Sequence, residues 1–185
     1  MKTYKAVIES IGPYSQSRHH DAPKLDKESA KDYETRTWRE RLHVDKNDEV
    51  FIPPMSFKNC LSEAAKYLGI QIPGKGKSTY TKHFEAGILI MDPVKLGVKK
   101  ENVTGEWFFV PSDGIRGSGK RVDKCFPVIP NWNGEVIINV LDETVTKDVL
   151  IKHLEESGKF IGIGRFRPRN NGFYGRFKIN NLKEI

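Results

Sequence analysis

The chain has 185 residues, and its 31 lysines and arginines outnumber 24 acidic residues for a net charge of +7; this length suits one well-buried core, so we expect a single domain over 1–185. No window has the apolar length of a membrane span, and the opening MKTYKAVIES lacks the apolar core of a secretory signal, which excludes a membrane protein and indicates a cytoplasmic location. The two cysteines, Cys60 and Cys125, form no CxxC pair and no histidine stands at metal-ligand spacing, so we expect no disulfide, no zinc site and no cofactor.

The first predicted element is a strand over 3–11, which ends at Gly12-Pro13. Residues 14–48 differ from it, because charges of both signs dominate and large apolar residues are few. We therefore expect 14–48 to be a thumb-like excursion inserted into the domain, available for self-association or for a protein partner. Around Trp38 the pattern fits either a helical turn or a pair of strands.

A helix is predicted over 56–68, where Ser56 is placed to cap it and Gly69 to end it. Its apolar residues recur at helical spacing, which gives one buried stripe that includes Cys60. The following PGKGKSTYTKH, 73–83, carries lysines among glycines and small residues and indicates a mobile basic loop.

Strands are predicted over 85–92 and 104–111, and SDGIRGSGKRVDK, 112–124, reads as a flexible basic segment. The run GEVIINVLD, 134–142, is the clearest buried strand of the chain. A helix over 146–157 follows, capped by Thr146 and ended by Gly158.

The last segment concentrates the charge of the chain. From Lys159 onward there are seven basic residues and one acidic residue, and 161–179 interleaves four arginines with four glycines and four aromatic residues. Asn171-Gly172 predicts a tight turn into a final strand over 172–179, with Phe173, Phe177 and Ile179 on one face and Tyr174, Arg176 and Lys178 on the face left open to a ligand. The upstream part reads as a glycine-rich loop whose amides could contact phosphate.

Without the excursions, the predicted order is strand, helix, strand, strand, helix, strand. This pattern predicts an α+β protein with a ferredoxin-like (RRM-like) βαββαβ core, an inserted thumb-like segment and a C-terminal glycine-rich loop. Apolar periodicity places the following residues in the core: Phe57, Leu61, Leu68, Ile88, Ile90, Ile138, Val140, Leu150, Leu154 and Phe177.

Two segments resemble the RAMP superfamily, the repeat-associated proteins that form backbone subunits of CRISPR effector complexes. VFIPPMSFKNCLSEAAKYL, 50–68, is similar to the segment that opens the superfamily's first helix, and FIGIGRFRPRNNGFYGRFKI, 160–179, is similar to its C-terminal glycine-rich loop. The usual Ser-Lys-Gly start and a later arginine are absent from the helix, and RPRNN is inserted in the loop. The resemblance implies a fold that binds RNA or another single strand; a short chain with this ending also resembles bacteriophage proteins.

These patterns predict a non-catalytic protein that binds single-stranded RNA or DNA rather than duplex. Arginines and lysines would neutralise phosphates and Tyr174 would stack a base. The predicted nucleic-acid-binding residues are Arg165, Arg167, Arg169, Tyr174, Arg176, Lys178, Lys58, Lys75, Lys77, Lys120 and Arg121.

Two other functions remain open from the sequence. The resemblance to RAMP-type nucleases implies a metal-independent endoribonuclease in which His19 or His20 acts as general acid or base, whereas a solvated loop is the alternative reading of His19-His20-Asp21. The third hypothesis is a viral protein that imitates or binds a host CRISPR effector subunit.

Overall fold

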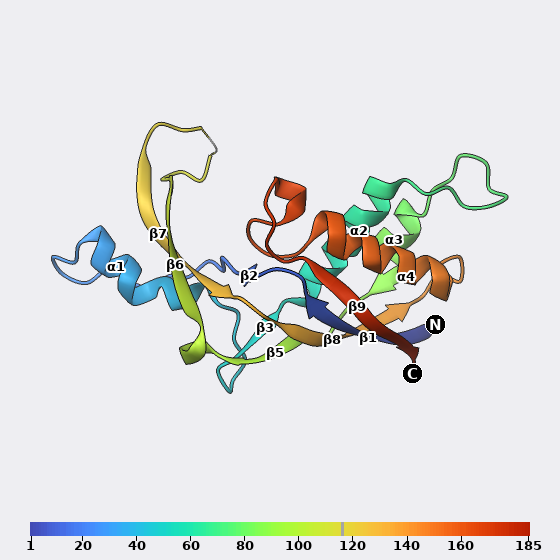
Figure 1. The fold of residues 1–185 in the computed structure, drawn as a ribbon, viewed down its shortest axis with the longest axis horizontal. Helices are drawn as coiled ribbons and strands as arrows, with labels where there is room; N and C mark the ends of the chain where they lie inside the picture. Colours follow the sequence, from blue (N-terminus) through green and yellow to red (C-terminus); the bar gives the residue numbers. More distant parts are fainter. Residues whose placement is uncertain (116) are drawn as a thin grey trace.

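The computed structural model describes residues 1–115 and 117–185; Arg116, part of the predicted flexible segment 112–124, lies outside the described residues. The principal layer is an antiparallel sheet whose strands lie in the order β4-β8-β1-β9 (Figure 1). The strand predicted over 3–11 is therefore central, because it pairs on both sides. The four strands are β1 (Lys2–Ser10), β4 (Ile88–Leu89), β8 (Asn133–Val140) and β9 (Phe177–Glu184).

Two helices, α2 (Pro54–Leu68) and α4 (Lys147–Glu156), cover one face of this sheet and contact each other (Figure 1). Alternate residues of β1 are buried, and every member of the predicted core except the half-buried Leu68 is buried as well. The four strands of this sheet and these two helices follow the order βαββαβ along the chain, and the predicted α+β class is confirmed. No helix in the described ranges is long and apolar enough to cross a membrane.

A second group of strands is built around a long hairpin. β6 (Thr104–Pro111) pairs along its length with β7 (Arg121–Ile129), and β2 (Tyr14–Ser15) pairs with the other edge of β7. The strand predicted over 104–111 is confirmed, whereas 121–124 belongs to β7 and not to a flexible segment. The remaining elements of this part are β3 (Glu49–Ile52), which pairs with β5 (Val94–Lys99), and η2 (Lys100–Asn102).

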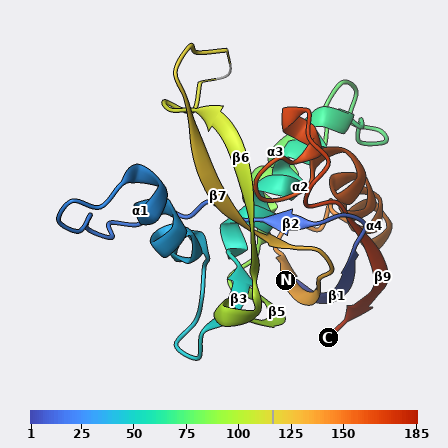
Figure 2. The ribbon, with the colours of Figure 1, turned by 60° about the vertical axis from the view of Figure 1, so that its left-hand side comes forward.

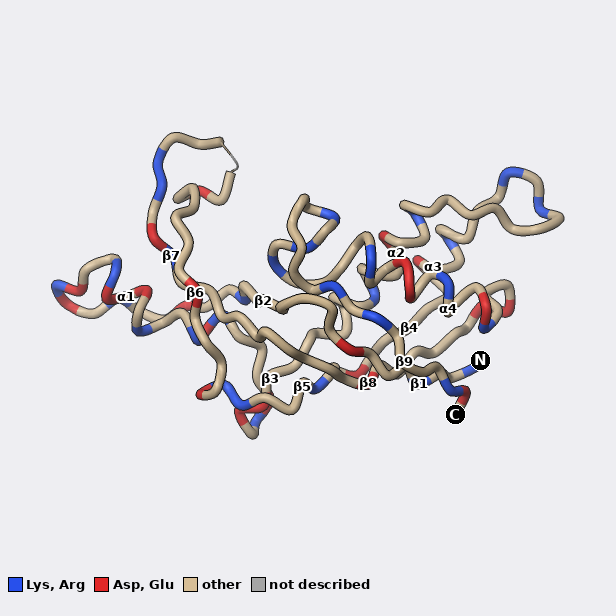
Figure 3. Tube along the Cα trace, viewed as in Figure 1, with Lys and Arg blue, Asp and Glu red and all other residues tan. Residues whose placement is uncertain are grey.

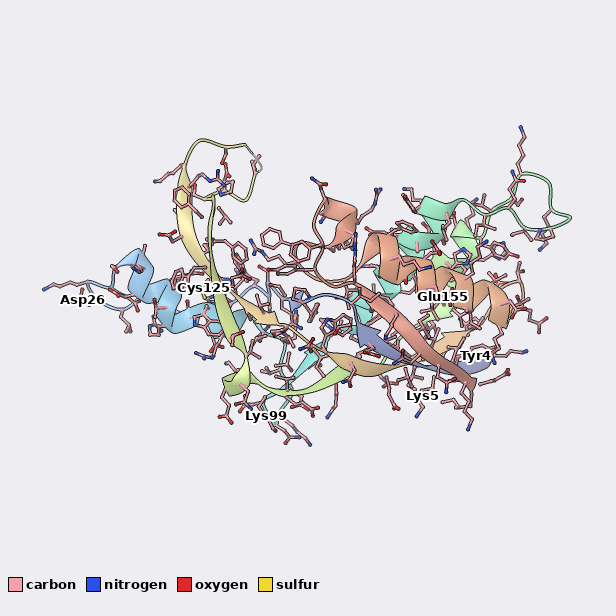
Figure 4. All side chains as sticks on the ribbon, viewed as in Figure 1. Tyr4, Lys5, Asp26, Lys99, Cys125 and Glu155 are labelled. Carbon is pink, nitrogen blue, oxygen red and sulfur yellow. The ribbon has the colours of Figure 1, made fainter. Side chains whose placement is uncertain are left out.

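Residues 14–48, here called the thumb segment, protrude beside this hairpin, with Asp26 labelled at the far end (Figure 4). The segment contains α1 (Ala30–Thr37) and η1 (Trp38–Arg41), so the choice left open around Trp38 falls to a helix. It is anchored by Trp38, which is 7% exposed and packs on Gly105. A Cβ added at Gly105 would lie 3.1 Å from the indole ring of Trp38.

Two predicted elements have wrong bounds in the first half of the chain. α2 begins at Pro54, after Pro53, so Ser56 lies inside the first turn and does not cap it. Proline at the first helical position has its φ already fixed for a helix, which moves the start forward. In the strand predicted over 85–92, residues 85–87 end α3 (Thr81–Gly87), only 88–89 form a strand, β4, and 90–92 belong to neither.

The C-terminal boundaries also differ from the prediction. Gly158 does not end the helical segment, because a π-helical turn, η3 (Ser157–Ile161), follows α4 directly. This turn ends at Gly162, which has φ 68°. Asn171, at φ 63°, ends the short helix η4 (Pro168–Asn170) and does not form a hairpin turn with Gly172. The last strand is therefore β9, five residues later than the predicted 172–179.

Candidate nucleic-acid interface

The glycine-rich loop, residues 162–176, is held closed by its own backbone. The Ile163 amide donates to the Gly175 carbonyl oxygen at 3.1 Å, and the Gly175 amide donates to that of Pro13 at 2.7 Å. The Arg165 amide donates to the Ser15 carbonyl oxygen at 2.9 Å. The expectation that the loop offers its amides to phosphate is wrong for these three, because they bond within the protein.

The Arg165 side chain lies among aromatic rings between the glycine-rich loop and the β6–β7 hairpin. Its guanidinium carbon is 3.2 Å from the ring centroid of Phe126, 4.0 Å from that of Phe166 and 5.3 Å from that of Phe108. Burial, with the charge of Arg41, lowers the pKa of Arg165 to about 10, so the group remains a cation at neutral pH. The loop thus holds a positive charge against the faces of aromatic rings, as in a cation–π interaction.

The other predicted cations of the loop and β9 have different surroundings. Arg167 pairs with Glu63 of α2 through two contacts of 3.0 and 3.1 Å, and Lys178 pairs with Glu9 at 3.2 Å. Arg169 is exposed on η4, and Arg176 is half-buried. Neither Arg169 nor Arg176 has an acidic partner within salt-bridge distance in the described part of the chain. Of these four predicted cations, two therefore form salt bridges with acidic residues and two do not.

Tyr174 does not lie on an open strand face, contrary to the prediction. It is 7% exposed, and its hydroxyl donates to Glu106 Oε2 at 2.8 Å. The left-handed conformation of Gly175, at φ 68°, interrupts the strand before β9 and breaks the alternation on which the prediction rested. Phe173 occupies the exposed position instead, at 60% exposure. Tyr174 therefore cannot offer its ring to a base in this arrangement.

The thumb segment brings His20 to a buried ion pair. Arg41 binds both oxygens of Glu34 at 2.8 and 3.1 Å, and its Nη1 lies 3.2 Å from His20 Nε2. Arginine can only donate, so Nε2 is the unprotonated acceptor, and burial together with Arg41 lowers the pKa of His20. His19 points to solvent, with its side chain 88% exposed, and contacts Asp21 at 2.9 Å. The two histidines thus have separate partners.

An open groove of about 1620 Å³ is lined by residues of the thumb segment, the β6–β7 hairpin and the glycine-rich loop. Figure 2 shows the ribbons of α1, β6 and β7, which belong to the first two of these segments. Arg18, Arg121, Lys124 and Arg165 line it, and none of them has an acidic partner within salt-bridge distance in the described residues. Two acids, Glu34 and Asp123, lie in the same lining, and Glu34 is occupied by Arg41 and by the Cys125 amide, which donates at 2.9 Å. The groove therefore presents mostly positive charge beside exposed Phe109.

The predicted lysine track is not continuous in space. Lys75 and Lys77 lie in the loop between α2 and α3, at the opposite end of the molecule from the hairpin (Figure 3). The Lys58 ammonium donates to Ser62 Oγ, to the Phe84 carbonyl oxygen and to that of Glu85, so its donors are used within the protein. Lys120 and Arg121 are exposed at the end of the hairpin, and Arg121 reaches the groove.

Sequence reasoning missed the hairpin side of this interface. Phe108 and Phe126 hold Arg165, and Arg18 and Lys124 add charge to the groove. A usable signal was present, because apolar runs at 104–111 and 125–129 flank a glycine- and serine-rich turn, as in a hairpin. No cluster of three potential metal ligands occurs among residues 1–115 and 117–185.

No family model matches the chain, and no curated protein matches it either. Solved structures share its fold. A chain from the cryo-EM structure of the Type III-B Cmr-beta bound to cognate target RNA aligns with 100% of this chain and 60% of its own length, at TM-score 0.57 and 10% identity. Cmr6 from Pyrococcus furiosus aligns over 97% of this chain and 98% of its own, at TM-score 0.50 and 11% identity.

These two neighbours define the fold of the chain. Both are RAMP-type CRISPR proteins, so the resemblance predicted from the two motifs is confirmed for the fold. The chain spans three fifths of the length of the first neighbour and nearly the whole length of the second.

Proposed function

We propose that the chain binds single-stranded nucleic acid, RNA in particular, in the groove between the thumb segment, the hairpin and the glycine-rich loop. The observation that supports this proposal is that basic side chains without an acidic partner and aromatic rings line one open groove. Lysine and arginine side chains neutralise phosphates, and each neutralised phosphate releases condensed counterions. Exposed rings stack on unpaired bases, which favours a single strand over a duplex.

The contact residues differ from those expected from the sequence. Arg165 and Arg121 remain from the predicted set, and Lys124 and Arg18 join them along the groove, whereas Arg169 does not line it. Phe109, which lines the groove at 61% exposure, takes the stacking role first given to Tyr174. Lys58 drops out of the set because its donors are used within the protein.

The fold neighbours support the choice of RNA. The Cmr-beta structure is described as bound to cognate target RNA, and its subunit has the fold of this chain. Because identity is 10%, the likeness identifies no shared contact residue. The proposal that the ligand is RNA and not DNA therefore depends on the structural neighbour. The proposal that the chain binds nucleic acid at all depends on the groove.

We propose binding without cleavage, because His20 is poorly placed to move a proton. Its Nε2 accepts from Arg41, and the exposed His19 contacts Asp21 without a second group from the groove. General acid–base cleavage needs two free groups within reach of the same phosphate. His19 and His20 nevertheless line the groove, so the experiment that tests binding must also test for metal-independent cleavage of RNA.

The test is a fluorescence anisotropy titration of labelled single-stranded RNA, single-stranded DNA and duplex at several salt concentrations, all in EDTA. We expect the single strands to bind more tightly than the duplex, with affinity falling as salt rises. The same samples are then run on a denaturing gel. RNA of unchanged length agrees with the proposal, whereas shorter products identify the nuclease. Absence of binding at low salt overturns the proposed function.

A protein partner would give a different result. A CRISPR effector subunit or a second copy that contacts the thumb segment would remain bound after nuclease treatment, because such a contact needs no nucleic acid. Pull-down before and after nuclease separates these cases. Recovery of a partner only before nuclease treatment agrees with a nucleic-acid bridge, and thus with the proposed function.

A further inference from the structure

The guanidinium of Arg165 has a buried nitrogen that donates no hydrogen bond within the described residues. Its Nη1 atom is inaccessible to solvent and has no hydrogen-bond partner among the described residues. Buried polar atoms are nearly always bonded, and those left unbonded require an explanation. Phe126 and Phe166 hold the group by their faces, which offers contact but no acceptor for an N–H in its plane.

The backbone beside Arg165 is strained into place. Phe166 has φ 55°, a conformation that bulky residues rarely adopt. The Phe166 carbonyl oxygen accepts from the Tyr174 amide at 3.0 Å, and Gly172 lies so close that a Cβ there would be 1.8 Å from that oxygen. Strain of this kind persists where the surroundings impose it, and it concentrates at ligand-binding positions. Here it fixes Phe166 over the guanidinium.

The surroundings of Arg165 repel a cation and supply no carboxylate. Arg41 lies on the same ring, 5.1 Å from the Phe126 centroid, and its charge contributes to the lowered pKa of Arg165. Of the two acids that line the groove, Glu34 already binds Arg41 and the Cys125 amide, and Asp123 lies beyond salt-bridge distance of Arg165. An anion entering the groove therefore approaches an Arg165 guanidinium whose charge no carboxylate neutralises.

We infer that Arg165 is the ligand of a single phosphodiester oxyanion at the junction of the thumb segment and the glycine-rich loop, oriented in advance by Phe126 and Phe166. The inference rests on the proposed function and makes it more specific, since it selects one phosphate of the strand. A planar guanidinium with adjacent donors matches two oxygens of a phosphate, whereas a lysine ammonium offers a point charge. Burial on the rings makes the interaction stronger than at an exposed arginine.

The experiment observes the arginine Nε–Hε signals of the unaltered protein by NMR. Inorganic phosphate is added first, and then a short single-stranded RNA. We expect the Arg165 signal to shift and saturate with both probes, whereas the signal of Arg169, exposed on the same loop, shifts little with phosphate. An Arg165 signal that stays in place throughout the RNA titration overturns the inference.

Two matched variants separate the subsite from charge alone. Arg165→Lys keeps the charge but loses the planar pair of donors, and we expect single-stranded RNA affinity to fall roughly tenfold, the size of one strong bidentate contact. Arg169→Lys should change affinity less than twofold. Equal affinities of Arg165→Lys, folded by circular dichroism, and the parent protein contradict the inference.

The two proposals fail in distinguishable ways. If RNA binds but the Arg165 signal does not respond and Arg165→Lys is neutral, the subsite is wrong and the proposed function stands. If phosphate moves the Arg165 signal but no RNA binds, the oxyanion site stands and the proposed function fails. A shift produced by an acidic peptide, and not by phosphate or RNA, assigns the site to a protein carboxylate and overturns the inference.

Discussion

Residues 73–79 and the glycine-rich loop, 162–176, are alike in sequence and differ in structure. Both combine glycines with basic residues. A Cβ added at Gly74 or Gly76 would meet nothing within 4 Å, whereas one added at Gly175 would lie 1.8 Å from the Ile163 carbonyl oxygen. Glycine therefore allows an open turn in the first segment and allows close packing in the second.

The basic residues differ in the same way. Lys75 and Lys77 are exposed on the loop between α2 and α3. In the glycine-rich loop, Arg165 is fixed on aromatic rings and Arg167 is fixed by Glu63. A charge held in one geometry loses less side-chain freedom when it binds, so the packed loop is the better ligand site. Composition alone does not distinguish these two cases.

The largest expected effect is on stability, and it tests the contrast between the glycines. Gly175→Ala adds both a left-handed alanine and an overpacked contact, so we expect a loss of roughly 3 kcal/mol or more in the free energy of unfolding. Gly76→Ala adds strain alone and should cost about 1 kcal/mol. Urea unfolding of both variants measures the difference. Equal losses would remove the basis of the comparison.

A smaller effect concerns pH and the helix that leads into the glycine-rich loop. His153 of α4 is buried, its Nδ1 donates to the Val149 carbonyl oxygen at 2.7 Å, and burial lowers its pKa. The unfolded chain thus binds a proton more readily than the folded one, and stability falls as pH drops below about 6.5. Burial also lowers the pKa of His20 and His43, which add to this slope.

A single variant isolates the share of His153. His153→Gln removes its titration, so the loss of unfolding free energy between pH 7 and pH 5 should be smaller than in the parent protein. His19→Gln, at an exposed position, serves as the control for the His-to-Gln substitution itself. A parent protein whose stability does not depend on pH in this range would contradict the burial argument.

The smallest effect distinguishes paired from unpaired arginines within the glycine-rich loop. Glu63→Gln removes the carboxylate that holds Arg167, leaving an additional unpaired cation in the glycine-rich loop. We expect affinity for single-stranded RNA to rise a few-fold at low salt, with the gain disappearing at high salt because charge attraction is screened. Anisotropy at two salt concentrations detects it. Weaker binding would mean that Glu63 positions Arg167 for its ligand.

Elements with local signals were predictable from the sequence. The apolar stripe of α2, the aromatic run of β6 and the Thr146 cap of α4 each depend on residues close together in the chain. The end of α4 was not predictable, because Gly158 continues into a π-turn packed against Phe177, where a Cβ would lie 2.1 Å from the carbonyl oxygen. The constraint at Gly158 thus comes from a residue of the following strand.

The candidate site was predictable in position but not in its contacts. The arginines of 161–179 indicated a polyanion surface, and Arg165 does line the groove. The partners that decide the role of each residue are distant in sequence: Glu63 is 104 positions from Arg167, and Glu106 is 68 positions from Tyr174. Such pairs are set by tertiary packing, which one sequence does not reveal.

The central claim is that the groove, and not the loop between α2 and α3, binds the nucleic acid. The direct test compares the salt dependence of single-stranded RNA binding for Arg121→Ala/Lys124→Ala in the groove and Lys75→Ala/Lys77→Ala in the loop, which remove equal charge. We expect the logarithmic salt slope to flatten by about 1.4 units in the groove variant and to stay unchanged in the loop variant, at roughly 0.7 per phosphate contact. Equal flattening in both variants, or flattening in the loop variant alone, would contradict the claim.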